Sequence, residues 1–206
     1  MAKIKLTKTE LKAQTDALKR FQRFLPMLQL KKQQLQSEIA GIVAKAESVS
    51  AREREVRSEL DSWVGLIATD EELLSGLVSV KSVKTGTANI AGVAIPTFES
   101  IDTDVKDIDA WATPAWIDDA VAVTTQILSL QCERRVYEEQ RRLVQEELRQ
   151  TSQRVNLFEK VKIPQCKEAI RVIKIALGDE QTAAVTRGKI AKSRVPDASP
   201  EGEVAA

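Results

Sequence analysis

The stretch that decides the fold covers residues 11–67 and reads LKAQTDALKRFQRFLPMLQLKKQQLQSEIAGIVAKAESVSAREREVRSELDSWVGLI. Steps of seven residues from Leu11 meet an apolar side chain at seven of nine positions, and steps of seven from Gln14 do so at seven of eight. A seven-residue repeat kept over about eight heptads is typical of a coiled-coil seam, because an ordinary helix drifts off this repeat. We therefore expect one helix of about 90 Å. Lys32 and Glu53 interrupt the seam, and such polar breaks usually set register or partner contacts.

A second long helix is expected to begin near Thr113-Pro114 and to run past Lys189. Thr113 can cap the helix, Pro114 suits the first helical position, and Asp118 and Asp119 would lie in the positively polarised first turns. The apolar pattern changes phase around Pro164 and resumes in steps of seven at Ile163, Ile170, Leu177 and Ala184. Because proline removes a backbone donor and crowds the preceding turn, we expect a kink there without an end to the helix.

The segment between the two helices has a different sequence pattern. Thr69 and Glu72 form a capping-box pattern, which predicts a short helix closed by Gly76. The following stretch, residues 77–101, alternates apolar and polar side chains and is typical of a β-hairpin. We expect its turn at Thr85-Gly86 and a bulge at Gly92.

The sequence therefore predicts a mainly α protein, a long antiparallel two-helix coiled coil with a short helix and a β-hairpin in its connector. The folded connector brings both termini to one end of the pair. The expected parts are an N-terminal coiled-coil helix at 1–68, the connector at 69–112, a C-terminal coiled-coil helix at 113–194 and a flexible tail at 195–206.

Charge is balanced in total but segregated along the chain. The 31 basic and 30 acidic residues leave a net charge of +1, which gives no global reason to expect nucleic acid or an anionic membrane as partner. Residues 1–36 carry nine basic and two acidic side chains, and residues 160–194 carry nine and three. Residues 99–119 carry seven acidic side chains against Lys106 alone. The paired ends are therefore expected to be basic and the connector end acidic.

The residues that usually perform catalysis or bind metals are scarce. The chain has no histidine, and its two cysteines, Cys132 and Cys166, would lie roughly 50 Å apart on one helix, so neither a zinc site nor a disulfide is expected. Both are expected to be small buried hydrophobes. No phosphate-binding loop occurs, and no apolar run has the length of a membrane span or signal peptide. We expect no catalytic residues, cofactor or metal, and a cytoplasmic location without membrane insertion.

The stretch TSQRVNLFEKVKIP, residues 151–164, resembles the Arg-Val-Asn-x-x-Glu...Ile-Pro signature of the D subunits of V-type and archaeal-type rotary ATPases. LTKTELKAQTDALKRFQRFLPMLQLKKQQLQ is similar to the opening helix of that family, and NIAGVAIP to its hairpin arm. TPAWIDDAV resembles the bacterial branch. The similarity runs from about Leu6 to Ile190, and several motifs occur in the same order.

The resemblance implies a central-stalk rotor shaft whose paired termini enter a hexameric ATPase head, while the hairpin end faces the membrane rotor. The implied partners are catalytic and non-catalytic head subunits, a small central-stalk subunit and a membrane-rotor adaptor, with the chain peripheral to the membrane. Protons and sodium ions both fit as the coupled ion, and so do ATP synthesis and hydrolysis. The positions that match the family motif, and would lie on the shaft, are Arg154, Val155, Asn156, Glu159, Ile163 and Pro164. The cations expected to face acidic head loops are Lys12, Lys19, Arg20, Arg23, Lys174 and Arg187.

Two other classes of protein share some of these features. The stalk of an export-apparatus ATPase is also a coiled-coil hairpin, but it would be shorter and would lack the β-hairpin. A nucleic-acid-binding coiled coil could use the basic end, although the neutral total charge and an aromatic content of 4% disfavour it.

Overall fold

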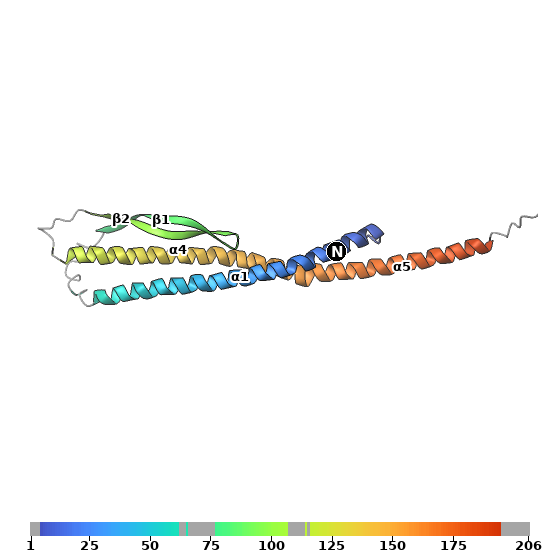
Figure 1. Cartoon of the computed structure of the whole chain (residues 1–206), viewed down its shortest axis with the longest axis horizontal. Helices are drawn as coiled ribbons and strands as arrows, with labels where there is room; N and C mark the ends of the chain where they lie inside the picture. The colour runs from blue at the N-terminus through green and yellow to red at the C-terminus, as the bar shows by residue number, and fades with distance from the viewer. Residues whose placement is uncertain (1–4, 62–64, 66–76, 107–113, 115, 195–206) are drawn as a thin grey trace, which may run out of the picture. The chain divides into compact units, whose positions relative to one another are not determined.

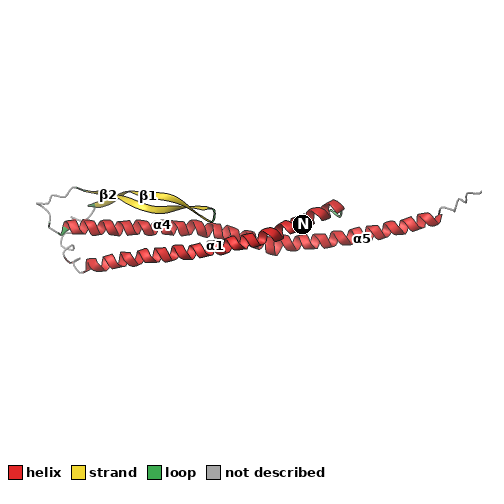
Figure 2. Cartoon of the chain, in the orientation of Figure 1, coloured by secondary structure: helices red, strands yellow, loops and turns green. Residues whose placement is uncertain are grey.

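The structure is a computed structural model that describes residues 5–61, 65, 77–106, 114 and 116–194. Its secondary structure is mainly helical with one antiparallel hairpin, which confirms the predicted fold class (Figure 1, Figure 2). The elements are α1 (Lys8–Asp61), β1 (Val78–Ile90), β2 (Val93–Val105), α4 (Ile117–Asn156), a π-helical segment η1 (Leu157–Lys162) and α5 (Ile163–Arg194).

The chain forms two compact units. The first combines residues 1–27 with residues 155–206, so both ends of the chain belong to it. The second covers residues 28–154 and holds the remainder of α1, the hairpin and most of α4.

The heptad series describes α1 correctly. Every seam residue from Leu11 to Val56 is buried or partly buried, and the exposed fraction is 0% at Leu35 and 1% at Val49. The helix starts after Thr7, whose hydroxyl accepts a hydrogen bond from the Glu10 backbone N–H at 3.3 Å. This hydroxyl therefore satisfies one of the backbone donors left free in the first turn.

Within the second unit the two helices run antiparallel. Lys31 on α1 pairs with Glu147 on α4 at 2.6 Å, while Arg52, farther along α1, pairs with Glu133, which comes earlier on α4, at 3.3 Å. The order of partners is therefore reversed between the helices, as the coiled-coil prediction requires.

The hairpin turn lies six residues later than predicted. Ile90 pairs with Val93, and the two turn residues Ala91 and Gly92 have φ angles of 51° and 87°. Two positive φ values in a two-residue loop match the twist of the flanking strands. The Asn89 side chain accepts a hydrogen bond from the Gly92 N–H at 2.9 Å. The prediction of a bulge at Gly92 is therefore wrong, since this glycine is part of the turn.

Thr85 and Gly86 lie inside β1, so the turn predicted there is wrong as well. A Cβ atom on Gly86 would lie 2.6 Å from Glu99 Oε1 and 2.8 Å from Thr97 Oγ1. The glycine therefore allows a close approach of these side chains instead of a chain reversal. The pairing register shifts between Val80 and Ser82 and again between Lys84 and Thr85.

The tip of the hairpin packs on the helix pair. Ile95, with 4% of its surface exposed, joins Leu35 and Ile42 of α1 and Val144 of α4 in one buried cluster. The Gln140 side chain donates a hydrogen bond to the Pro96 carbonyl at 2.5 Å. A two-stranded hairpin is only marginally stable by itself, so this packing holds it in place.

The second long helix starts later than predicted. Its first residue is Ile117, whose N–H donates to the Pro114 carbonyl at 3.1 Å, so Pro114 precedes the helix instead of occupying its first position. Asp118 and Asp119 do lie in the first turn, as expected. Thr113, the predicted short helix at 69–76 and the predicted flexible tail lie outside the described residues.

Near Pro164 the helix widens and continues, as α4 passes through η1 into α5. The Ile163 N–H donates to the carbonyl of Phe158, five residues earlier, which is the π-helical pattern. Such a turn absorbs the phase change seen in the sequence, because it takes up one residue more than an α-helical turn. The expected continuation past Pro164 is confirmed, and the change in geometry falls in the turn before the proline.

Cys132 and Cys166 are free and buried, as predicted. Burial also raises the pKa of the Cys166 thiol above its usual value. We expect a thiol reagent at neutral pH to label both cysteines slowly in the native protein and rapidly in denaturant, because both side chains are buried in the folded state. Timed labelling with Ellman's reagent, followed by peptide mapping, measures this, and rapid native labelling of either cysteine would contradict the buried placement.

Candidate functional site

The break in the seam at Glu53 forms a buried polar layer in the second unit. Glu53 is 7% exposed. It accepts a hydrogen bond from the Gln131 side chain at 3.2 Å and pairs with Arg57 at 2.7 Å and Arg134 at 3.8 Å. The carboxylate is thus compensated from its own helix and from α4. Such a layer favours one axial register of the pair, because a slip would leave a buried charge without partners.

Replacing Glu53 with alanine is expected to lower the free energy of unfolding by about 1–3 kcal/mol, because the partners of the carboxylate lose their buried acceptor. The exposed Glu55, two residues along the same helix, is the matched control, and its replacement by alanine should change stability by less than about 0.5 kcal/mol. Denaturant melts of both variants measure the difference. Equal effects would show that the polar layer adds no stability.

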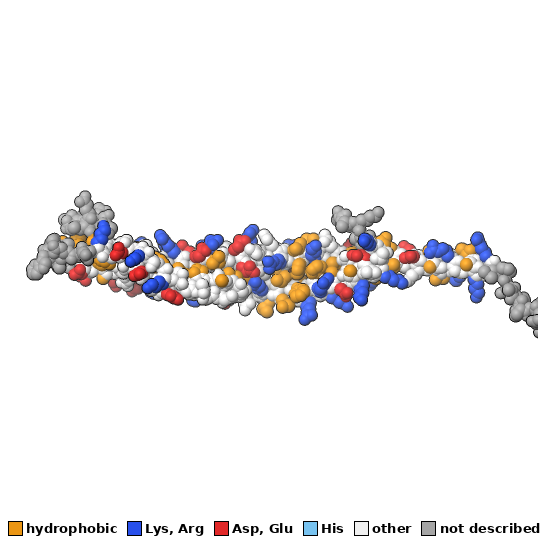
Figure 3. Space-filling view, turned by 90° about the horizontal axis from the view of Figure 1, so that it is seen from above, with side chains coloured by type: hydrophobic (Ala, Val, Ile, Leu, Met, Phe, Trp, Pro, Cys, Tyr) orange, Lys and Arg blue, Asp and Glu red, His pale blue; other side chains and the backbone are white. Residues whose placement is uncertain are grey.

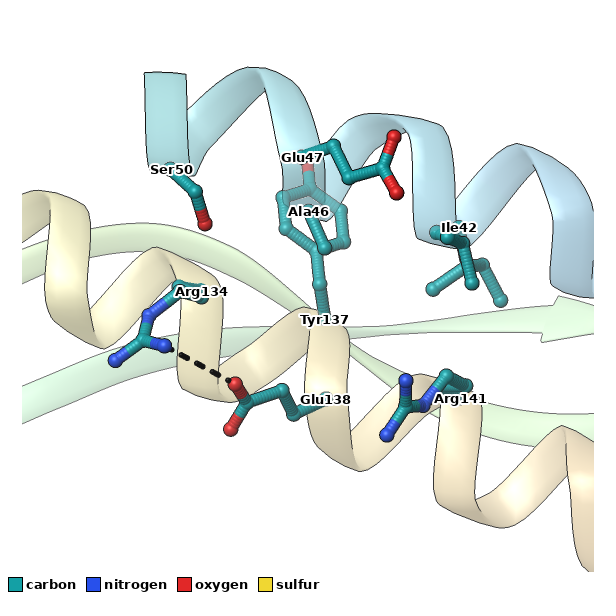
Figure 4. Close-up of a pocket in the computed structure, with 9 residues that line it drawn as sticks. Ile42, Ala46, Glu47, Ser50, Arg134, Tyr137, Glu138 and Arg141 are labelled. Atoms are coloured by element: carbon teal, nitrogen blue, oxygen red, sulfur yellow. Dashed lines mark ion pairs between the residues drawn. The ribbon is translucent and has the colours of Figure 1, made fainter. Parts of the chain in front are cut away.

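A groove of about 170 Å³ lies between α1 and α4 in the second unit (Figure 4). Tyr137 points from α4 toward Ala46 on α1, while Arg134 and Glu138 form an ion pair at 3.5 Å along its border. Burial, and then the neighbouring Glu133 carboxylate, raise the pKa of Tyr137. The groove is bordered by this phenol and by charged side chains, of which Arg134 and Glu138 are paired, while Glu47 and Arg141 form no ion pair with a described residue.

The described residues contain neither a metal-binding cluster nor a membrane-spanning helix. Among them no group of three or more His, Cys, Asp or Glu side chains could hold a metal ion. In this part of the chain, no helix has the length and apolar character needed to cross a membrane.

The six cations predicted to contact partners all belong to the first unit and are exposed. Lys12, Lys19, Arg20 and Arg23 are spread along α1, while Lys174 and Arg187 lie on α5. No ion pair joins any of the six to a carboxylate in the described part of the chain. The structure does not gather them into one pocket. It presents them as separate charges along the helices.

Residues 178–194 of α5 are exposed throughout. In Figure 1 this part of the helix extends past the start of α1. Val185 and Ile190 are 59% and 47% exposed, and residues 181–194 contain four basic and no acidic side chains. An isolated helix of this length is marginal in water, so a partner that surrounds it would stabilise it.

The family-motif positions lie on both sides of the boundary between α4 and η1. Val155 is 5% exposed, Ile163 is partly buried, and both are apolar. Arg154, Asn156, Glu159 and Pro164 are exposed. The three polar side chains among them make no hydrogen bond or ion pair with the described residues. The motif therefore combines core contacts with polar groups that are free to meet another molecule.

Sequence reasoning missed the exposed apolar side chains near η1. Phe24 and Met27 lie outside the seam of α1 and are 49% and 61% exposed, and Leu157 and Val161 of η1 are 43% and 39% exposed. The signal was present in the sequence, since Phe24 and Met27 are apolar residues that belong to neither heptad series.

The fold is a coiled-coil pair with an anchored hairpin, and it presents unpaired surface cations and an exposed helix end. These features are typical of a structural component of a larger assembly. Comparison with known proteins identifies the family. The model of the family of ATP synthase D subunits matches residues 10–193. The V-type ATP synthase D subunit of Borreliella burgdorferi is 45% identical over 193 residues, covering 94% of this chain and 95% of the relative. The protein of the same name from Chlamydia felis is 31% identical over 206 residues, covering 99% of each chain.

The chain belongs to the family of ATP synthase D subunits, as its bacterial relatives and its matched length show. Members of this family are central-stalk components of rotary ATPases. The resemblance found in the sequence motifs is thereby confirmed, and the export-apparatus and nucleic-acid-binding alternatives are not favoured.

Proposed function

We propose that the chain is the rotating shaft that couples ATP hydrolysis or synthesis in a catalytic hexamer to ion translocation across the membrane. The observation that carries this proposal is the uncovered end of the first unit, where α5 lies exposed over residues 178–194. This helix end carries unpaired cations and exposed apolar side chains. Such a surface is suited to contact with a ring of subunits that encloses it.

The role of the chain in this proposal is mechanical. The first unit pairs two helices of different sequence, so a hexamer around it meets a different surface on each side. Each orientation of the shaft then favours a different conformation in each catalytic site, and rotation and site occupancy shift each other as linked equilibria. The chain itself binds no nucleotide and hydrolyses none.

The proposed partners follow from the two kinds of surface. The basic terminal end meets acidic loops of the catalytic and non-catalytic head subunits. The hairpin unit, with the acidic side chains of β2 and the first turn of α4, meets the small central-stalk subunit and the adaptor of the membrane rotor. The chain is then peripheral to the membrane, on its cytoplasmic side, and touches no lipid.

A rotation assay tests the proposal. A bead is attached through a cysteine placed at the exposed hairpin residue Thr87, in a chain whose two buried cysteines are replaced by serine. With the catalytic hexamer fixed to glass, we expect ATP to drive stepwise rotation of the bead, and the chain alone to show no ATP hydrolysis. A bead that stays still while the assembled hexamer hydrolyses ATP would refute the shaft role.

A further inference from the structure

Exposed apolar side chains lie on η1 and on the adjoining part of α1, outside the buried core of the described residues. Phe21 of α1 and Phe158 of η1 contact each other, with ring centroids 5.0 Å apart and an interplanar angle of 47°. This contact places η1 beside the part of α1 that carries Phe24 and Met27, all within the first unit. We call the exposed side chains of Phe24, Met27, Leu157 and Val161 the η1 patch.

The local geometry of both helices presents these side chains in pairs. Phe24 and Met27 are three residues apart on α1, a spacing that makes them neighbours on the helix surface. Leu157 and Val161 are four apart in η1, where the hydrogen bond from Ile163 to Phe158 shows the wider π-helical turn. No residue of η1 is buried, and single π-helical turns are frequent at functional sites.

The charges beside the η1 patch are mostly basic. Residues 20–27 carry Arg20 and Arg23, and residues 157–162 carry Lys160 and Lys162 against one acidic side chain, Glu159. All five charged side chains are exposed, and none forms an ion pair with a described residue. Figure 3 shows exposed hydrophobic side chains gathered on one face of the chain with Lys and Arg beside them.

We propose that the η1 patch is a second contact site for the ATPase head and that it takes a segment combining apolar side chains with carboxylates. The charge of the surroundings selects an acidic segment, and the exposed phenylalanine, methionine and leucine supply the apolar contact that the centre of an interface needs. This site rests on the proposed shaft function. It is separate from the uncovered end of α5, because it lies at η1, where α1 is still paired.

Binding of two matched variants to the catalytic hexamer tests the site. The double variant Phe24→Ser with Leu157→Ser removes half of the η1 patch, and Val80→Ser with Val105→Ser removes two valines of similar exposure, 36% and 40%, from the hairpin. We expect the first to raise the Kd for the hexamer about tenfold or more, and the second to leave it unchanged, because central apolar residues carry most binding energy. Circular dichroism of both variants should match the parent chain, since the replaced side chains are exposed.

A photocrosslinker at Phe24, in the otherwise unchanged chain, identifies the occupant even if a serine variant folds poorly. We expect it to label a head-subunit peptide that contains carboxylates and apolar residues, with less labelling in high salt. Labelling of a second copy of this chain, labelling of no head subunit, or an unchanged Kd in the patch variant would each overturn the site while the shaft function stands. Failure of the parent chain to bind the hexamer would overturn both.

Discussion

Replacing Val49 with aspartate is expected to lower the free energy of unfolding by about 3 kcal/mol or more and the melting temperature by roughly 10 °C. Val49 is 1% exposed and lies at a seam position of α1. The native acid Glu53 is compensated by a glutamine and two arginines, whereas a carboxylate at Val49 enters a place built for an apolar side chain. The cost also includes the lost apolar packing of the valine.

The control for this variant is Glu38→Gln on the same helix, at a position that is exposed and makes no ion pair with the described residues. It should shift the melting temperature by no more than about a degree or two. Thermal melts followed by circular dichroism measure both variants. Equal shifts would mean that Val49 does not belong to the packed seam of α1.

Reversing the charge of several cations in the first unit should block assembly or uncouple ATP hydrolysis from ion transport. The reversed positions are Lys12, Lys19, Arg20, Arg23, Lys174 and Arg187, all exposed. One surface pair contributes only about 0–1 kcal/mol, so a single reversal should have little effect, but six glutamates add repulsion against acidic head loops at a moving contact. The helicity should stay near that of the parent chain, because none of the six side chains is buried.

The matched control reverses six exposed cations of the second unit: Lys45, Arg54, Lys81, Lys84, Arg135 and Arg141. It changes the net charge equally, so it separates a local bearing contact from a general charge effect. Both variants are reconstituted with the catalytic hexamer and the membrane rotor, and hydrolysis and ion uptake are measured at two salt concentrations. If the first-unit variant assembles normally and keeps the parent ratio of transport to hydrolysis at both salts, the contact there is not electrostatic.

Local pattern was sufficient for the long helices and for the class of fold. The heptads of α1 repeat so often that their apolar face can be buried only by a second helix packed along the seam. The buried side chains of Leu35, Ile42 and Val49 lie on this face. Glu53 could be recognised as a break because it stands where the series requires an apolar residue. Its partners Gln131 and Arg134 could not be recognised from the sequence, because they belong to the opposite helix and their position beside Glu53 depends on the axial register of the pair.

The sequence predicted the exposed cations of the candidate contact surface but not its exposed apolar side chains. A count of charges along the sequence found the six cations, and the structure leaves all of them exposed. A count of charges does not reveal the η1 patch. Phe24 and Met27 stand outside both heptad series of α1, but exposure at Leu157 depends on which face of its helix the partner helix covers. Composition gives the number of apolar residues, but the tertiary packing determines which of their side chains remain exposed to solvent.

The sequence by itself determined the two helices, the hairpin between them and the absence of histidine chemistry, because these follow from periodicity and composition. Only the tertiary structure decided where the chain reverses and how it passes Pro164. The turn lies at Ala91-Gly92, not at Thr85-Gly86, because this register lets Ile95 pack against both helices. The proline permits a kink, a stop or a wider turn, and the structure shows the wider turn, η1, with Val155 buried before it and Cys166 buried after it.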